Sequence, residues 1–143
     1  MNGCLVIDAS VAIKWYLPEI HAGAALEYLD ERFTLIVPEL FFAEFGNILW
    51  KKSRLGEISI AEAHGILDEI ERVPLQQHDI HSLLKPAFEL ATVHNSSVYD
   101  CVYLALAVTG GCQMVTADRK FFDKVVAGEY SGSIQWVEEG MSR

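Results

Sequence analysis

Residues 4–15 read CLVIDASVAIKW, in which four apolar residues run directly into the carboxylate of Asp8. Apolar residues resume two positions later, at helical spacing. A short apolar run of this kind is typical of a strand buried on both faces, and the change of period indicates a helix after it. We therefore expect Asp8 at the point where a buried strand gives way to a helix.

The remainder of the chain repeats this alternation of short apolar runs and helical stretches. The apolar runs predict strands at 4–7, 33–37, 73–76, 112–116 and 133–137. The helical stretches are 9–17, 22–32, 38–53, 59–72, 79–94, 98–108 and 119–127. Strands separated by helices predict parallel β-α-β units with helices on both faces of the sheet. The expected fold is a three-layer α/β/α sandwich with a short parallel central sheet, in a single domain over residues 1–143.

Local signals mark several helix ends. Pro38 is expected as the first residue of its helix, because proline is favoured there. Ser59, with Glu62 three positions later, matches a capping box. Gly110 and Gly111 are expected to end the helix over 98–108, which is apolar on nearly every face and therefore buried by its neighbours.

Composition narrows the class of protein. The chain has 143 residues, of which 51% are hydrophobic, and no apolar run approaches the roughly 18 residues of a membrane span. We see no signal peptide and expect a cytoplasmic protein without membrane contact. Cys4, Cys101 and Cys112 lie in apolar segments, and we expect them to be reduced core residues rather than a disulfide or a zinc site.

The net charge of −9 argues against binding of nucleic acid through bulk electrostatics. Ordinary solubility explains such a charge most simply. A nucleic-acid substrate must therefore be recognised at a local site.

Four acidic residues stand where a parallel sheet gathers ligands, beyond the carboxyl ends of its strands. Asp8 and Asp118 each follow a predicted strand, but each also precedes a helix and is suited to cap it. Asp100 opens the helix over 98–108 and matches a capping box with Ser97. For each of the three, capping and metal binding both remain open.

Glu44 lies in the middle of the helix over 38–53. It shares a helix face with Asn47 and Lys51, so a solvated polar stripe is one interpretation. The other is a carboxylate at the edge of the core, which needs a cation to offset its desolvation. Crowded carboxylates repel one another and favour a hard cation such as Mg²⁺, which takes oxygen ligands.

At these residues the sequence resembles the PIN-domain ribonucleases, most closely the VapC-type toxins of bacterial and archaeal toxin–antitoxin pairs. The matching pieces, which occur in family order over nearly the whole chain, are VIDASV, VPELFFAEFGNIL, YDCVYLALA and MVTADRKF.

The resemblance implies a metal site. The acids of the family fall on Asp8, Glu44, Asp100 and Asp118, which makes these the expected catalytic residues. Asp8 and Asp100 are implied as the most direct ligands of Mg²⁺ or Mn²⁺, and Glu44 and Asp118 as ligands that complete the site or bind through water. Three supporting residues are implied near these acids, namely Ser10, Asn47 and Thr116.

The implied activity is hydrolysis of RNA phosphodiester bonds without a side-chain nucleophile. Candidate RNA contacts are Lys14, Lys51, Lys52, Arg54, Arg119 and Lys120. The implied protein partner is a cognate antitoxin whose basic or extended tail enters the acidic cleft. A homodimer through exposed aromatic residues is a further expectation, with candidates Trp15, Tyr16, Phe41, Phe42 and Trp50, most of which are better suited to the core.

Two alternatives to a nuclease follow from the same residues. The first is a PIN-like module that holds RNA or a protein without cleaving it. The second is a phosphoryl-transfer domain with Asp8 as nucleophile, which needs another acid just before Asp8 or two residues after it. Ile7 and Ser10 occupy those positions, so this alternative ranks last.

Overall fold

The computed structural model describes residues 3–139 and contains one five-stranded parallel sheet. Its strands are β1 (Cys4–Ile7), β2 (Thr34–Pro38), β3 (Leu75–His78), β4 (Gln113–Thr116) and β5 (Ile134–Trp136). The spatial order is β3-β2-β1-β4-β5, so the chain begins in the middle of the sheet. The direction of winding reverses between β1 and β4. In open parallel sheets, a reversal of this kind creates a crevice at the carboxyl ends of the two strands.

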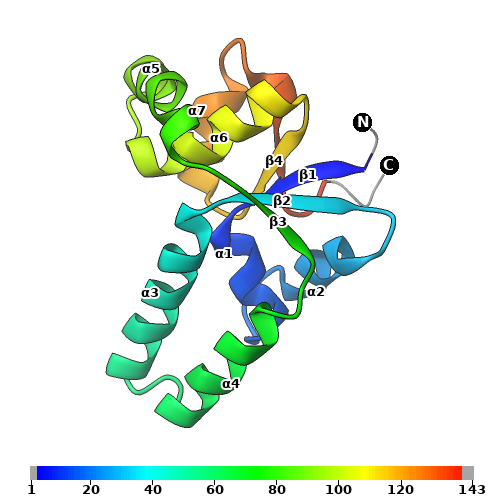
Figure 1. Ribbon diagram of the computed structural model, residues 1–143, viewed down its shortest axis with the longest axis vertical. Coiled ribbons are helices and arrows are strands. Elements are labelled where there is room, and N and C mark those ends of the chain that lie inside the picture. Colours follow the sequence, from blue (N-terminus) through cyan, green and yellow to red (C-terminus); the bar gives the residue numbers. More distant parts are fainter. Residues whose placement is uncertain (1–2, 140–143) are drawn as a thin grey trace.

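Helices cover both faces of the sheet (Figure 1). They are α1 (Ala9–Ala12), α2 (Ala22–Leu26), α3 (Leu40–Arg54), α4 (Ile60–Ile70), α5 (Leu84–His94), α6 (Val98–Gly110) and α7 (Arg119–Val126). The helices α1 to α4 lie on one side, and α5 to α7 lie on the other. The predicted three-layer α/β/α arrangement is thereby confirmed.

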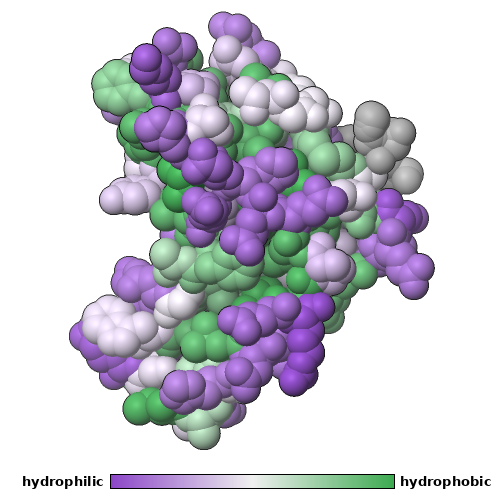
Figure 2. Space-filling model, in the orientation of Figure 1, coloured by the Kyte–Doolittle hydropathy of each residue, from purple (hydrophilic) through white to green (hydrophobic). Residues whose placement is uncertain are grey.

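The hydrophobic core lies on both faces of the central strands. Val6, Ile7 and Met114 of β1 and β4 are fully buried, and every residue of 101–107 in α6 is buried. Figure 2 shows hydrophilic side chains on the outer surfaces of both helical layers, with a strip of hydrophobic surface between the layers. None of the helices within residues 3–139 is both long enough and apolar enough to cross a membrane.

The predicted role of Pro38 is wrong. Pro38 is the last residue of β2 and pairs with His78 of β3, and α3 begins two residues later at Leu40. The backbone N–H of Glu39 donates to the carbonyl of His78, so pairing of the two strands extends past the proline. Proline is tolerated at the end of a strand because it lacks only its own N–H.

The expectation of three reduced cysteines is also wrong. Cys4 and Cys112 form a disulfide with their Cα atoms 5.4 Å apart, whereas Cys101 is buried with a free thiol. Cys4 opens β1 and Cys112 directly precedes β4, and the register of these neighbouring strands pairs Leu5 with Gln113. The two cysteines are therefore brought together by strand adjacency across 108 positions of sequence.

Other boundaries differ by a few residues. The third strand begins at Leu75 instead of residue 73, and a 3₁₀ turn over His81–Leu83 precedes α5. The Ser59 capping box and the termination of α6 at Gly111 are confirmed. The prediction of a single domain over 1–143 includes residues 1–2 and 140–143, which lie outside the described residues.

Candidate active site

Asp8 lies at the carboxyl end of β1, with only 7% of its surface exposed. Its Oδ2 accepts hydrogen bonds from the hydroxyls of Ser10 (2.9 Å) and Thr116 (2.8 Å). Its Oδ1 accepts a longer hydrogen bond of 3.5 Å from the backbone N–H of Ser10, which caps α1. Asp8 therefore caps a helix and at the same time presents a buried carboxylate held by two hydroxyl groups.

The same hydroxyls connect β1 to the segment after β4. Ser10 Oγ accepts from the backbone N–H of Ala117 at 3.2 Å, and Thr116 Oγ1 accepts from the N–H of Asp118 at 3.1 Å. Each hydroxyl thus donates to Asp8 and accepts from a backbone N–H of the segment that follows β4. These hydrogen bonds fix the orientation of the Asp8 side chain at the carboxyl ends of β1 and β4, where the winding of the sheet reverses.

Burial raises the pKa of Asp8 to about 7, in spite of the hydrogen bonds from Thr116 and Ser10 that lower it. The negative charges of Asp100 and Glu44 raise this pKa further. The like charges of the group act on one another, because the carboxylates lie near one another in a poorly solvated place.

Asp100 and Asp118 are at the N-termini of two helices. The backbone N–H of Asp100 donates to Ser97 Oγ at 3.1 Å, and Asp118 Oδ1 accepts from the N–H of Phe121 at 3.2 Å. Burial and then the charge of Asp118 raise the pKa of Asp100, while Ser97 and Lys124 lower it. Capping by Asp118 and proximity to the acidic group both hold in the structure.

Glu44 lies in the middle of α3 and is half-buried. Its Oε1 accepts a hydrogen bond of 2.8 Å from the hydroxyl of Tyr103, a fully buried residue of α6. Burial raises the pKa of Glu44, the hydrogen bond from Tyr103 lowers it, and the charge of Asp100 raises it. Asn47, one turn along α3, is exposed.

All four acids line one pocket of about 630 Å³. The polar stripe of α3 forms one wall, so Asn47 and Lys51 also line it, as does Ser10. The apolar part of the lining comes from Leu40, Ala43 and Ile48. The structure therefore brings together the acidic residues that the sequence distributes over more than a hundred positions.

A smaller depression of about 250 Å³ shares Asp100 and Asp118 with this pocket. Its lining includes Ser97, Lys120 and Lys124. The shared pair of acids thus stands between two adjoining hollows, one bordered by Lys51 of α3 and the other by Lys120 of α7.

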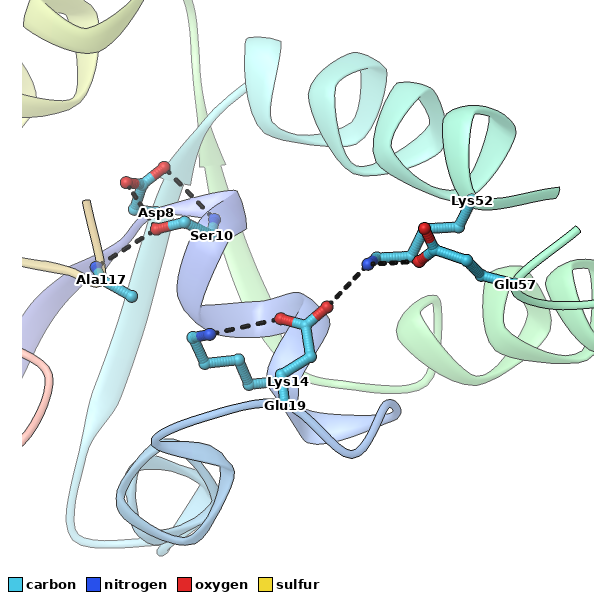
Figure 3. Close-up of polar contacts among 7 residues, drawn as sticks. All are labelled: Asp8, Ser10, Lys14, Glu19, Lys52, Glu57 and Ala117. Carbon is cyan, nitrogen blue, oxygen red and sulfur yellow. Dashed lines mark hydrogen bonds and ion pairs between the residues drawn. The ribbon is translucent and has the colours of Figure 1, made fainter. Parts of the chain in front are cut away.

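The other basic residues predicted as RNA contacts are engaged elsewhere. Lys14 is buried, and its Nζ lies 3.2 Å from Glu19 Oε1 (Figure 3). Lys52 Nζ lies 2.9 Å from the other oxygen of Glu19 and 3.4 Å from Glu57 (Figure 3). These lysines form a chain of ion pairs between the segment after α1 and the end of α3, and neither lines the acidic pocket.

The two arginines predicted as RNA contacts lie over aromatic rings. The guanidinium of Arg54 stands 5.0 Å from the ring centroid of Trp50, and that of Arg119 stands 4.1 Å from that of Trp136. Arg119 also pairs with Asp123 at 3.6 Å. Both arginines remain on the surface.

The donor set of the pocket is suited to a hard divalent cation. Among the described residues, the hydrogen bonds to Asp8 and Glu44 come from hydroxyls and a backbone N–H, so no cationic side chain neutralises them by direct contact. Within the same part of the chain, no three His, Cys, Asp or Glu side chains are close enough to hold a metal ion by themselves. The carboxylate oxygens of the pocket are of the kind that Mg²⁺ takes as ligands, together with waters.

Two tyrosines beside Asp100 were not predicted as site residues. Tyr99 is exposed and lines the pocket, and Tyr103 contacts Glu44 from the core. Helical spacing alone places Tyr103 one turn from Asp100 on the same face of α6. That spacing is the only signal in the sequence, because the partner of Tyr103 lies 59 positions away.

Comparisons with known proteins identify the family of the chain. The PIN domain family model matches residues 5–127. Ribonuclease VapC3 of Pyrobaculum aerophilum is 35% identical over 125 residues, which cover 86% of this chain and 95% of the relative. Ribonuclease VapC3 of Mycobacterium tuberculosis is 27% identical and covers 81% of this chain and 83% of the relative.

Solved structures show the same architecture. The crystal structure of PAE2754 from Pyrobaculum aerophilum superimposes with a TM-score of 0.72 at 25% identity, over 94% of this chain and 83% of that one. The chain therefore belongs to the PIN-domain family. Within that family it is a VapC-type ribonuclease, on the strength of its relatives. PIN-domain ribonucleases generally depend on divalent metal ions.

Proposed function

We propose that this chain is a metal-dependent endoribonuclease that acts as the toxin of a type II toxin–antitoxin pair. The observation that carries the proposal is the convergence of Asp8, Glu44, Asp100 and Asp118 on one pocket of a PIN-domain fold. We propose further that the whole chain, residues 1–143, is one PIN-like domain.

Asp8 and Asp100 are the proposed direct ligands of Mg²⁺ or Mn²⁺, and Glu44 and Asp118 complete the site directly or through water. When bound, the cation supplies a water of lowered pKa and neutralises charge on the phosphate. Ser10 and Thr116 hold the carboxylate of Asp8 in position, since both donate to its Oδ2. The amide of Asn47 lines the same pocket and is available to a substrate oxygen.

The RNA strand is proposed to cross the shared acids from one hollow to the other. Lys51 borders the larger hollow, and Lys120 and Lys124 border the smaller one. Lysines are suited to phosphates as point charges. The exposed ring of Tyr99 lies in the larger hollow, where a base of single-stranded RNA is able to stack on it. These lysines would attract the phosphates of RNA locally, although the chain as a whole has a net charge of −9.

Lys14 and Lys52 are left out of this proposal because Glu19 engages both. Arg54 and Arg119 are exposed and line neither hollow, and each lies over an aromatic ring. Their contribution would be long-range attraction.

The proposed protein partner is a cognate antitoxin with a basic or extended segment that enters the acidic pocket. VapBC2 from Rickettsia felis, solved bound to a DNA fragment from its promoter, shares this fold with a TM-score of 0.61 at 16% identity, over 82% of this chain and 90% of that one. We also propose a cytoplasmic location, where the RNA substrate is found. A homodimer through Trp50, which is 57% exposed, is part of the same proposal.

The test is cleavage of single-stranded RNA by the purified chain with Mg²⁺, with Mn²⁺ and with excess chelator. We expect cleavage to require the metal and to disappear in Asp8→Asn and Asp100→Asn, while circular dichroism shows that both remain folded. Asp68→Asn is the matched control, because Asp68 is exposed on α4 and does not line the pocket. Full activity in chelator, or in both site variants, contradicts the proposal.

The same experiment separates the nuclease from a non-catalytic binding module. A module predicts that the chain binds RNA without cleaving it and gives no heat of Mg²⁺ or Mn²⁺ binding in titration calorimetry. Retained RNA affinity with neither cleavage nor metal binding would favour the module.

A further inference from the structure

Tyr103 joins the two helical layers at the acidic pocket. It belongs to α6, and the acceptor of its hydroxyl, Glu44 Oε1, belongs to α3 at a distance of 2.8 Å. These helices cover opposite faces of the sheet (Figure 1). The hydrogen bond therefore spans the two layers beyond the strand ends, one turn along α6 from Asp100.

The contact restricts a side chain that otherwise has several rotamers. Glu44 is in the middle of a helix, and a free glutamate there samples many positions of its carboxylate. Oε1 is held by Tyr103, and within residues 3–139 no second hydrogen bond reaches the carboxylate. Oε2 is therefore left for the pocket that Glu44 lines.

A hydroxyl is the appropriate donor for this purpose. A lysine or arginine at the same place would fix Glu44 but would also neutralise it and compete with a cation. A neutral hydroxyl orients the carboxylate and leaves its full negative charge. Ser10 and Thr116 hold Asp8 by the same means, so the side chains that donate to these two acids are neutral hydroxyls.

We propose that Tyr103 is a positioning residue that orients Glu44 toward the divalent cation and its bound water. This inference rests on the proposed metal-dependent function. Tyr103 does not line the pocket, so it would act on the metal site through Glu44, although its hydroxyl also has a hydrogen bond with the backbone of Ala9.

A purely structural role for Tyr103 is the competing explanation, and Tyr28 provides the matched comparison. Tyr28 is also fully buried, its hydroxyl donates to the carbonyl of Val137 at 2.9 Å, and it accepts from Gln135 Nε2 at 2.9 Å. Tyr28 lies outside the acidic pocket. Removing either hydroxyl therefore removes hydrogen bonding in the interior, but only the hydroxyl of Tyr103 contacts a residue of the acidic pocket.

The experiment compares Tyr103→Phe and Tyr28→Phe in the full chain. The readouts are the melting temperature, Mn²⁺ affinity from calorimetry, and kcat and KM for RNA at saturating Mn²⁺. For Tyr103→Phe we expect roughly tenfold weaker Mn²⁺ binding and a roughly tenfold lower kcat with KM for RNA unchanged, because a charge-assisted hydrogen bond is lost. For Tyr28→Phe we expect a lower melting temperature with Mn²⁺ affinity and kcat unchanged.

A double-mutant cycle with Glu44→Ala completes the test, with Mn²⁺ affinity as the readout. If Tyr103 acts through Glu44, Tyr103→Phe has no further effect in the Glu44→Ala background. Additive losses, or wild-type Mn²⁺ affinity and kcat in Tyr103→Phe, overturn the inference while the nuclease proposal stands. Failure of the wild-type chain to bind Mn²⁺ and cleave RNA overturns both. If Tyr103→Phe does not fold, Glu44→Asp shortens the acid out of reach of the hydroxyl, and wild-type Mn²⁺ affinity in that variant also overturns the inference.

Discussion

The hydroxyl of Thr116 donates a hydrogen bond of 2.8 Å to Oδ2 of Asp8, across 108 positions of sequence. Thr116 is fully buried at the end of β4, and Asp8 lies at the end of the neighbouring β1. The contact therefore depends on the pairing of these two strands.

Thr116→Val removes this hydroxyl at nearly constant volume and leaves one fewer donor to the buried carboxylate. We expect a loss of roughly 2 kcal/mol in the free energy of unfolding and a severalfold loss of kcat. Denaturant titration and RNA cleavage at saturating Mn²⁺ measure the two effects. Thr109→Val is the control, since Thr109 donates only within α6, to Ala105 and Leu106. Equal kcat in the two variants would contradict the role of Thr116.

The stability of the metal-free protein is expected to depend on pH through Asp8. Burial, first of all, raises the pKa of Asp8 from 3.8 to about 7 in the folded state, so folding favours its protonated form. This contribution is present in full below pH 4 and is lost as pH rises through 7, with an upper limit of roughly 4 kcal/mol. The titration of Asp8 should therefore lower the melting temperature of the protein in chelator as pH rises from 4 through 7.

Asp8→Asn should flatten that pH dependence, although Glu44 and Asp100, whose pKa values are also raised, retain part of it. Addition of Mn²⁺ should reverse the loss near pH 7, because a cation stabilises the ionised carboxylates. An unchanged slope in Asp8→Asn would assign the pH dependence to other groups.

Glu19→Gln is expected to destabilise the fold strongly. Burial alone would raise the pKa of Glu19, but hydrogen bonds from Lys52 and Lys14 hold it below its ordinary value. The substitution leaves the buried ammonium of Lys14 without its counter-ion, at an expected loss of roughly 3 kcal/mol in denaturant titration. Glu57→Gln breaks an exposed pair with Lys52 in the same chain of charges, and we expect it to change stability by less than about 0.5 kcal/mol. Equal losses of unfolding free energy in Glu19→Gln and Glu57→Gln would contradict the importance of the buried Lys14 ion pair for stability.

Loss of the disulfide is expected to lower stability without abolishing activity. Cys4→Ser combined with Cys112→Ser opens a loop closed over 108 positions, with an expected loss of roughly 4 kcal/mol. The bond joins the amino ends of β1 and β4, whereas the acidic pocket is at their carboxyl ends, so cleavage well below the melting temperature should be retained. A reductant should lower the melting temperature of the parent chain and leave that of the double variant unchanged.

Lys51→Ala and Lys120→Ala are expected to raise KM for RNA severalfold with little change in kcat, because the lysines border the two hollows without contacting Asp8. The effect should shrink as salt concentration increases, since released counterions drive such contacts. Lys85→Ala, on the exposed surface of α5, is the control. A KM independent of both lysines would remove them from the path of the RNA.

The sequence predicts the elements well because their signals are local. The Ser59 capping box and the apolar period of α6 each lie within a few consecutive residues, and both were confirmed. Strand adjacency is not local, and the Cys4–Cys112 bond was missed for that reason. Pro38 was misassigned because the pairing of β2 with β3 outweighed the preference of proline for the start of a helix.

The same difference between local and non-local signals applies to the residues of the candidate site. Positions at strand ends, on α3 and at helix starts, together with family resemblance, led to the prediction that the four acids lie together, and all four line one pocket. Their partners were harder to find, because Tyr103 reaches Glu44 and Lys52 reaches Glu19 only in the folded chain. The sequence around Lys14 does not indicate whether this lysine forms a buried ion pair or lies on the surface as a free cation.

The placement of Asp118 long after Asp8 in the chain has a consequence for synthesis on the ribosome. Asp8 and Glu44 emerge early, but β4 must be made and inserted beside β1 before Thr116 can orient Asp8 and before the fourth acid arrives. A nascent chain thus cannot complete the lining of the pocket until Asp118 has left the ribosome.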